Sequence, residues 1–406
     1  MLRIVPRRQV RGALIVLIVL AIPCACAAGT SRSVEVSARD YDVLAVPVSV
    51  SVPVSDSGII VRASDTGAVV PCQIEKEGSD LRVTWMVEKL QAGRIRAYSI
   101  ESADEQASSD LDGVELKKGN EGVDVVVNGR LFTRYVFTGV PKPYCYPVIG
   151  PTGKMVTRSY PMEGVPREST DHKHHRSFWF TFGDVNGIDF WSESPKAGKI
   201  VHREFEKLVS GPVYGLIRSR NDWIAPDGKK VCEDVRELRV YRTTNGRLMD
   251  FDVTIRATDG RVELGDTKEG MMAFRVASSM EVDRGRGHIE NSRGHRDKSA
   301  WGKQAEWCDY YGPVDGKTVG IAVMNHPSSF RHPTYWHVRT YGLLAANPFG
   351  MRAFTRGSMS VGRYIIPAGG AVTFRYRIFI HEGSAHEAKV ADVYAAYADP
   401  PTVTIE

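Results

Sequence analysis

Asn-Gly pairs between segments of alternating apolar and polar residues constrain the fold of this chain more than any other feature. Three such pairs each lie between two candidate strands: 128–129 between 123–127 and 131–137, 186–187 between 178–182 and 188–191, and 245–246 between 235–241 and 248–255. An Asn-Gly pair favours a tight hairpin turn because both central residues of that turn have positive φ. The sequence therefore predicts a series of antiparallel hairpins.

The rest of the chain adds strands and only one candidate helix. Residues 372–380 alternate in polarity, which predicts a strand with one buried face. In residues 46–54, Pro47 and Pro53 place a strand at the edge of a sheet because proline cannot donate to the ladder. Residues 385–397 alone have apolar positions at helical spacing. An all-β fold follows, with a large antiparallel β-sandwich.

A polar segment at 101–112 predicts a boundary between two β domains, because 406 residues exceed what one ordinary core fills. We expect a small β-sandwich domain at 33–105 and a larger β domain at 113–400. Neither range contains a repeat of solenoid period.

The first 28 residues have the layout of a secretory signal peptide. Basic residues precede an apolar run at 13–22, and small residues follow it. The run is too short for a membrane-spanning helix. We therefore expect an exported, periplasmic or extracellular protein with no stable membrane span. Lipidation at Cys24 or Cys26 and twin-arginine export through Arg7-Arg8 are alternatives.

The net charge bears on possible partners, and the cysteine content bears on disulfide bonding. The formal net charge of +5 includes four leader arginines, so about +1 remains without the leader, and nucleic acid is not an expected partner. Beyond the leader the cysteines are widely spaced, which fits either buried thiols or one disulfide bond: Cys72, Cys145, Cys232 and Cys308.

The first candidate site is Asp171-His172-Lys173-His174-His175-Arg176. Histidine titrates near neutral pH, transfers protons and binds metals. If the segment is extended, His172 and His174 point to one side, and Asp171 and His175 to the other. The alternative is a polar loop whose imidazoles bind main-chain groups.

The second candidate site lies at 325–350, where imidazole, guanidinium, amide and aromatic groups occur together. Such groups bind hydroxyls and stack on sugar rings. The residues that we expect to contact a substrate, together with Arg176, are His332, Trp336, His337, Arg339 and Asn347. The alternative is that the aromatic residues fill the core.

Both segments, with residues 183–191, resemble the bacterial family of methane oxygenase PmoA-like proteins over roughly residues 115–395. The resemblance implies a β-supersandwich similar to that of galactose mutarotases, preceded by a small β domain, and a secreted partner in polysaccharide metabolism. The family label itself is not to be taken literally, because a membrane methane monooxygenase subunit needs transmembrane helices.

Three functional hypotheses follow. The first is a carbohydrate-active hydrolase, lyase or epimerase in which His172, His174 or His175 is the general acid or base and Asp171 orients an imidazole. The second is a non-catalytic glycan-binding protein that uses the same surface. The third is an enzyme with a histidine-ligated divalent metal, although no ligand-spacing motif is found. All three require the two histidine-rich segments to meet in space.

Overall fold

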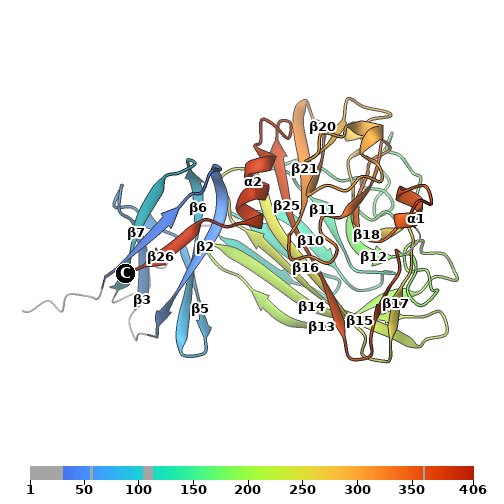
Figure 1. Ribbon diagram of the computed structural model, residues 1–406, viewed down its shortest axis with the longest axis horizontal. Coiled ribbons are helices and arrows are strands. Elements are labelled where there is room, and N and C mark those ends of the chain that lie inside the picture. The colour runs from blue at the N-terminus through green and yellow to red at the C-terminus, as the bar shows by residue number, and fades with distance from the viewer. Residues whose placement is uncertain (1–30, 55–57, 104–112, 360–361) are drawn as a thin grey trace, which may run out of the picture.

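The computed structural model describes residues 31–54, 58–103, 113–359 and 362–406, which form two lobes of β-strands (Figure 1). The larger lobe contains two eight-stranded antiparallel sheets, and the smaller lobe contains a five-stranded and a three-stranded sheet. The predicted all-β fold with a large antiparallel β-sandwich is confirmed. The predicted leader at 1–28 and most of the predicted boundary, 104–112, lie outside the described residues.

The small lobe is built from the first seven strands and the last one. Its five-stranded sheet has the order β26 (Thr402–Ile405), β1 (Arg32–Ser37), β7 (Ile95–Ala103), β3 (Gly58–Ala63) and β4 (Val69–Val70). Its three-stranded sheet has the order β2 (Val43–Pro53), β6 (Asp80–Leu90) and β5 (Cys72–Glu77). Pro47 and Pro53 lie in β2, which is an edge strand as predicted. Strand β26 follows the larger lobe in sequence but pairs with β1.

The large lobe is a sandwich whose two sheets enclose the main apolar core. One sheet has the order β22 (Tyr335–Arg339), β23 (Leu343–Asn347), β18 (Gly270–Arg275), β12 (Phe178–Phe182), β11 (Tyr144–Val148), β10 (Arg130–Val136), β9 (Gly122–Val127) and β8 (Val114–Lys118). The other has the order β13 (Lys199–Val209), β14 (Tyr214–Ile224), β15 (Lys230–Tyr241), β16 (Arg247–Arg256), β25 (Ala371–Glu382), β21 (Lys317–Asn325), β20 (Trp307–Val314) and β19 (His288–Asn291). A separate pair is formed by β17 (Val262–Leu264) and β24 (Tyr364–Ile366).

Two of the three predicted hairpins are present. Strands β9 and β10 pair around Asn128-Gly129, where both residues have positive φ, 51° and 71°. Strands β15 and β16 also pair, although around a longer loop in which Gly246 has φ of 76°. Local turn chemistry therefore identified the strand order at these two places.

The prediction of the third hairpin is wrong for its second strand. Asn186 and Gly187 do form a turn with positive φ, but residues 188–191 form no strand. The carboxylate of Asp189 instead accepts hydrogen bonds from the backbone N–H groups of Trp191, at 2.7 Å, and Ser192, at 3.1 Å. A side chain that binds backbone donors in this way competes with the sheet ladder.

The helical content is small. Helix α1 spans Met351–Phe354 and helix α2 spans Val390–Ala398, and two short 3₁₀ turns lie at Ser278–Met280 and Asp297–Ala300. The predicted helix over 385–397 starts only at Val390, because Lys389 takes the left-handed conformation. Within the described ranges, no helix is long and apolar enough to cross a membrane.

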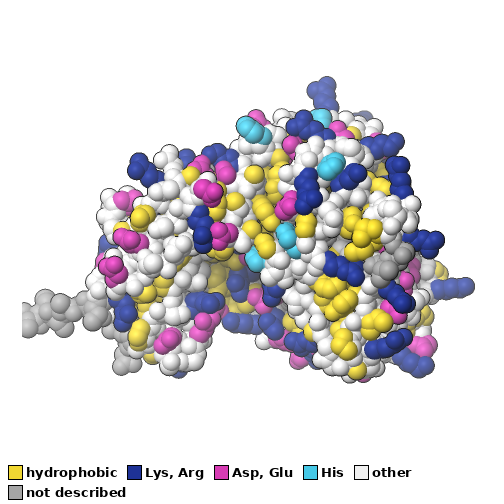
Figure 2. Space-filling model, in the orientation of Figure 1, with side chains coloured by type: hydrophobic (Ala, Val, Ile, Leu, Met, Phe, Trp, Pro, Cys, Tyr) yellow, Lys and Arg dark blue, Asp and Glu magenta, His cyan; other side chains and the backbone are white. Residues whose placement is uncertain are grey.

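The two lobes are joined by polar contacts next to a hollow that Figure 2 shows between them. The Gln73 side-chain oxygen of the small lobe accepts hydrogen bonds from the N–H groups of Val213, at 3.3 Å, and Tyr214, at 3.0 Å. Glu75 pairs with Lys207 at 2.8 Å.

The four cysteines beyond the leader are free thiols, three of them buried, which favours the buried-thiol interpretation over a disulfide bond. Cys24 and Cys26 lie outside the described residues.

Candidate functional site

The site is built on the outer face of the sheet that contains β11, β12, β18, β23 and β22. Residues that are directly opposite each other in neighbouring strands point to the same face. The register places one residue from each strand in a row on that face: Tyr144, Trp179, Ala273, Ala345 and His337. Three interstrand steps of about 4.8 Å separate Trp179 from His337, which is roughly 14 Å. The two small alanines between them form the floor of the site.

The histidine-rich segment covers one end of this floor. It is a turn and not the extended segment considered from the sequence, because His172 has φ of 45° and its carbonyl accepts a hydrogen bond from the His175 N–H at 2.9 Å. The alternation of side chains that we expected is therefore wrong. The rings of His172 and His175 stack instead, with centroids 4.8 Å apart.

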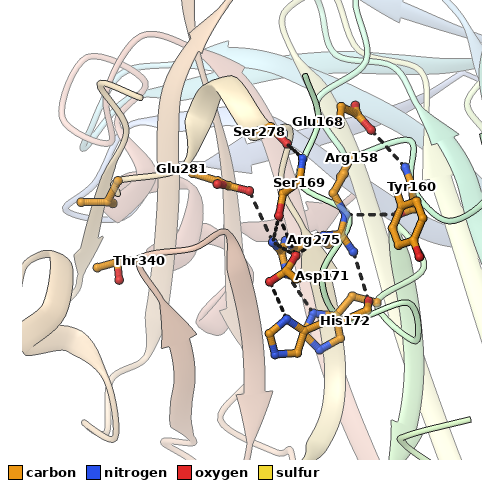
Figure 3. A network of polar contacts seen from close by, with 12 residues as sticks. Arg158, Tyr160, Glu168, Ser169, Asp171, His172, Arg275, Ser278, Glu281 and Thr340 are labelled. Carbon is orange, nitrogen blue, oxygen red and sulfur yellow. Dashed lines mark hydrogen bonds and ion pairs between the residues drawn. The ribbon is translucent and has the colours of Figure 1, made fainter. Parts of the chain in front are cut away.

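Asp171 is the centre of a network of charged groups (Figure 3). Its Oδ1 accepts hydrogen bonds from Arg158 Nη1 at 2.6 Å, Arg275 Nη2 at 2.8 Å and Ser169 Oγ at 2.6 Å. Burial alone would raise the pKa of Asp171, but the Ser169 hydrogen bond and the charge of Arg275 outweigh it and lower that pKa strongly. Both arginine side chains are fully buried. Asp171 is therefore a fixed carboxylate ion at neutral pH.

The other oxygen of Asp171 orients His172. Oδ2 lies 2.5 Å from His172 Nδ1. Because an ionised carboxylate can only accept, Nδ1 is the ring nitrogen that donates to Asp171, and Nε2 takes no part in this contact. The side chain of His172 is 40% exposed, so Nε2 can reach a ligand. Its ring also stacks on Tyr341 at 4.9 Å.

His174 and His175 are neutral at pH 7. Burial lowers the pKa of His174 to about 4, helped by the charge of Lys142. Burial and neighbouring positive groups also lower the pKa of His175 far below its usual value. His175 Nδ1 lies 3.3 Å from Arg275 Nη1, a donor, so Nδ1 accepts. His175 contributes to positioning the network more than to proton transfer.

Part of the second segment meets this turn through Tyr341. The guanidinium of Arg339 lies 5.6 Å from the Tyr341 ring and 5.7 Å from the Trp301 ring. His337 faces the same surface and its Nδ1 donates to the Lys268 carbonyl at 2.6 Å. The first segment therefore meets residues 339–341 of the second, with Tyr341 in contact with both His172 and Arg339, whereas no ring contact among the described residues joins a histidine of one segment to a histidine of the other.

Four residues that we expected to bind substrate have their polar groups bound to other parts of the protein. Trp336 is fully buried in the sandwich core, where its indole N–H donates to the Ala305 carbonyl at 2.9 Å. Asn347 is also fully buried, and its amide binds the Thr267 carbonyl and the Phe349 N–H. Arg176 forms an ion pair with Glu193 in which Nε and Nη2 make three hydrogen bonds to the carboxylate. His332 binds the Asn325 side chain at 3.0 Å and takes no part in the contacts around Tyr341.

Sequence reasoning missed Glu269 and the indoles. The charge of Glu269 acts on both His174 and His337, so this partly buried carboxylate lies between the two segments. Among the described residues, three buried indole N–H groups at the site have no acceptor: those of Trp179, Trp191 and Trp301. No motif marks Glu269, and the sequence analysis assigned no role to these three indoles.

Comparison with known proteins identifies the family. Residues 122–395 match the family described as "Family of unknown function (DUF6807)". The chain belongs to the DUF6807 family. That description names no activity and no methane oxygenase. The match covers most of the range over which we noted the resemblance.

Solved structures similar to this DUF6807 protein are distant. They include an alpha-mannosidase from Enterococcus faecalis V583, with 12% identity and a TM-score of 0.46 over 93% of this chain and 46% of that chain. A glycosyl hydrolase family 38 protein from Enterococcus faecalis has 11% identity and a TM-score of 0.41, over 93% and 47%. A variant of a glycoside hydrolase family 97 enzyme from Pseudoalteromonas sp. strain K8 has 9% identity and a TM-score of 0.27, over 66% and 34%. The chain spans about half the length of the first two. A comparison with curated proteins finds no match.

The DUF6807 site has a buried floor and a partly exposed rim. The rim consists of His172, His174, Glu269, Trp301, Arg339 and Tyr341. Four cavities of the described part of the chain, including the largest of the four at about 650 Å³, are lined by other residues. Within the described ranges, no group of three or more His, Cys, Asp or Glu side chains is arranged to hold a metal ion. The metal hypothesis therefore has no ligand set in that part of the chain.

Acid is expected to destabilise the DUF6807 region through its buried histidines. Burial lowers the pKa of His337 to about 4, compared with about 6.5 for an unfolded histidine. Between these two values the unfolded chain binds a proton that the folded chain does not, so the free energy of unfolding falls as the pH is lowered. Urea denaturation at a series of pH values should show a shallower fall for His337→Gln than for the wild type. Equal slopes for wild type, His337→Gln and the control His288→Gln would contradict this, because His288 is an exposed histidine.

Proposed function

We propose that this protein is a carbohydrate-active enzyme in which His172 transfers a proton and the surrounding rim holds the sugar. The observation that carries the proposal is the pair formed by Asp171 and His172. An imidazole oriented by a fixed carboxylate, with its other nitrogen exposed, is a suitable general base. The exposure of His172 distinguishes it from His175, which is buried and neutral.

The groups around His172 support a ligand rich in hydroxyls. The half-buried rings of Trp301 and Tyr341 lie on the rim on either side of Arg339, and aromatic rings stack on the apolar face of a sugar. Arg339 lies within about 6 Å of both the Tyr341 and the Trp301 rings, where it can bind a carbonyl or carboxylate oxygen of the substrate.

In this mechanism Nε2 of His172 takes a proton from a hydroxyl or from a carbon next to a carbonyl. Asp171 stabilises the imidazolium that forms, because its carboxylate is held in place by Arg158 and Arg275. Arg339 stabilises the negative charge that develops on the substrate. Hydrolysis, elimination and epimerisation all include such a step. The leader pattern at 1–28 supports an exported enzyme, so fragments of extracellular polysaccharides are the glycans to screen.

The test is to incubate the protein with these glycans, separate the products by chromatography and measure binding by calorimetry. On a glycan that is converted, His172→Gln should lower kcat by about 10²-fold, because general-base catalysis contributes at least that much. Lys173→Gln is the matched control, since Lys173 is an exposed residue of the same turn. Its kcat should equal that of the wild type.

Two results would contradict the proposed enzyme. If His172→Gln keeps full activity, His172 is not the proton-transfer group. If a glycan binds and is recovered unchanged, the protein is a glycan-binding protein that uses the same rim.

A further inference from the structure

The junction between the two lobes contains a cleft that is separate from the histidine site. Its volume is about 650 Å³, within the range of small-molecule sites. The small lobe contributes Met86 and Glu88 of β6, and the large lobe contributes the turn between β9 and β10 and the loop between β15 and β16.

Three arginines line this cleft: Arg130, Arg242 and Arg247. Among the described residues, none of the three has a carboxylate oxygen within 4.0 Å. Arg242 Nε donates to the side-chain oxygen of Asn128 at 3.1 Å, and Arg247 Nη1 donates to the Gly246 carbonyl at 3.2 Å. Arg247 Nε is buried and has no acceptor within the described ranges. The three arginines therefore have no ion-pair partner among the described residues, and after Glu88, the single carboxylate of the lining, is counted, an excess of two positive charges remains.

Several other arginines of the large lobe do have carboxylate partners. On the neighbouring strand β14, Arg218 binds Glu206 at 2.7 Å and Glu237 at 3.0 Å. In the cleft, burial and the charge of Arg130 lower the pKa of Arg247, which shows that the two like charges are close to each other. Placing like charges together without a counter-ion costs free energy, and a bound anion removes that cost.

The one described carboxylate that lines the cleft has another partner. Glu88 accepts hydrogen bonds from Thr244 Oγ1 at 2.8 Å and Thr244 N at 3.3 Å. It therefore holds the loop between β15 and β16 against the small lobe. This contact fixes the loop that carries Arg242 and leads into Arg247, so the arginines are positioned before any ligand binds.

We propose that the cleft between the lobes binds an acidic oligosaccharide, with Arg130, Arg242 and Arg247 contacting its carboxylate or sulfate groups. The planar guanidinium matches the oxygen geometry of both anions. Asn128 supplies an amide for sugar hydroxyls, and Pro71, Pro151 and Pro212 supply apolar surface. The site is independent of His172, because it lies at the β9–β10 turn and involves none of the rim residues. It would hold an acidic polysaccharide at a second place on the molecule, apart from the proposed catalytic rim.

Calorimetry on the full chain tests this with four probes: trigalacturonate, a chondroitin sulfate hexasaccharide, a neutral cello-oligosaccharide and a single-stranded DNA oligonucleotide. The first two arms distinguish carboxylate from sulfate. We expect at least one of them to bind, with an affinity that falls as salt is added, and the neutral sugar to bind at least tenfold more weakly. Equal affinity for DNA would overturn the proposal, since it would show a general polyanion surface.

Variants then locate the binding. Arg130→Gln and Arg247→Gln should each weaken the binding about tenfold, because each removes a charge-assisted contact. Arg130 is exposed, so this variant should fold even if Arg247→Gln does not. The control is Arg134→Gln on the same strand β10, whose partner is Asp124.

Unchanged binding in Arg130→Gln, or an equal loss in the control, would overturn the proposal. His172→Gln should bind the acidic sugar as the wild type does. Loss of catalysis and loss of this site are therefore separable.

Discussion

Replacing Arg275 with methionine is expected to lower the free energy of unfolding by about 3–5 kcal/mol. The Arg275 side chain is fully buried and pairs with Asp171 at 2.8 Å and with Glu281 at 3.3 Å. Methionine fills much of the same volume but leaves the buried Glu281 without its counter-charge. Burial already raises the pKa of Glu281, and Arg275 opposes that effect. Urea denaturation at neutral pH measures the change.

The control for Arg275→Met is Arg134→Met. Arg134 pairs with Asp124 on the surface and its side chain is 49% exposed, so its loss should cost no more than about 1 kcal/mol. The double variant Arg275→Met with Glu281→Gln should recover part of the stability, because the uncompensated charge is gone. A loss for Arg275→Met no larger than that of the control would show that the network around Asp171 does not stabilise the fold.

Replacing Asp234 with alanine is expected to have an effect of the same size, about 3–5 kcal/mol. Asp234 is fully buried and accepts hydrogen bonds from Asn221 at 2.7 Å, from Trp223 at 2.7 Å and from two nitrogens of Arg236 at 2.9 and 3.0 Å. Arg236 also donates to the Phe180 carbonyl in the opposite sheet. The network therefore ties the two sheets of the sandwich together.

The conservative variant Asp234→Asn separates charge from shape. It keeps the size of the side chain and some of the hydrogen bonds but leaves Arg236 without a counter-ion, so it should be less stable than the wild type and more stable than Asp234→Ala. Thermal and urea unfolding can rank the three proteins. If Asp234→Asn is as stable as the wild type, the hydrogen bonds of Asp234 contribute to stability and its charge does not.

The sequence indicated those parts of the fold that local chemistry decides. The Asn128-Gly129 turn needs positive φ at both residues, and two neighbouring strands follow from it. The strand expected at 188–191 is absent because Asp189 takes up the backbone donors that a ladder would use. A hydrogen bond between a side chain and the nearby backbone cannot be predicted from the alternation of apolar residues.

The site was predictable only where its residues are unusual in themselves. The histidines of the 171–176 turn attract attention in any sequence, and His172 does lie on the exposed rim. Glu269 does not attract attention in the sequence. Its position between His174 and His337 results from the pairing of β18 with β12 and β23. Trp336 was predicted to bind substrate but lies in the core. Alternate residues of β22 face opposite sides of the sheet, and only the register shows which side is the core.

The pairing of β26 with β1 has a consequence for biosynthesis. Strand β1 precedes the entire large sandwich in the chain and its partner β26 follows it. During translation, one edge of the nascent small lobe therefore stays open while the large sandwich emerges from the ribosome, for on the order of tens of seconds at ordinary elongation rates. An unpaired strand edge invites pairing with other chains. The small lobe can therefore be completed only once β26 is available, so its folding depends on residues that are made after the whole large sandwich.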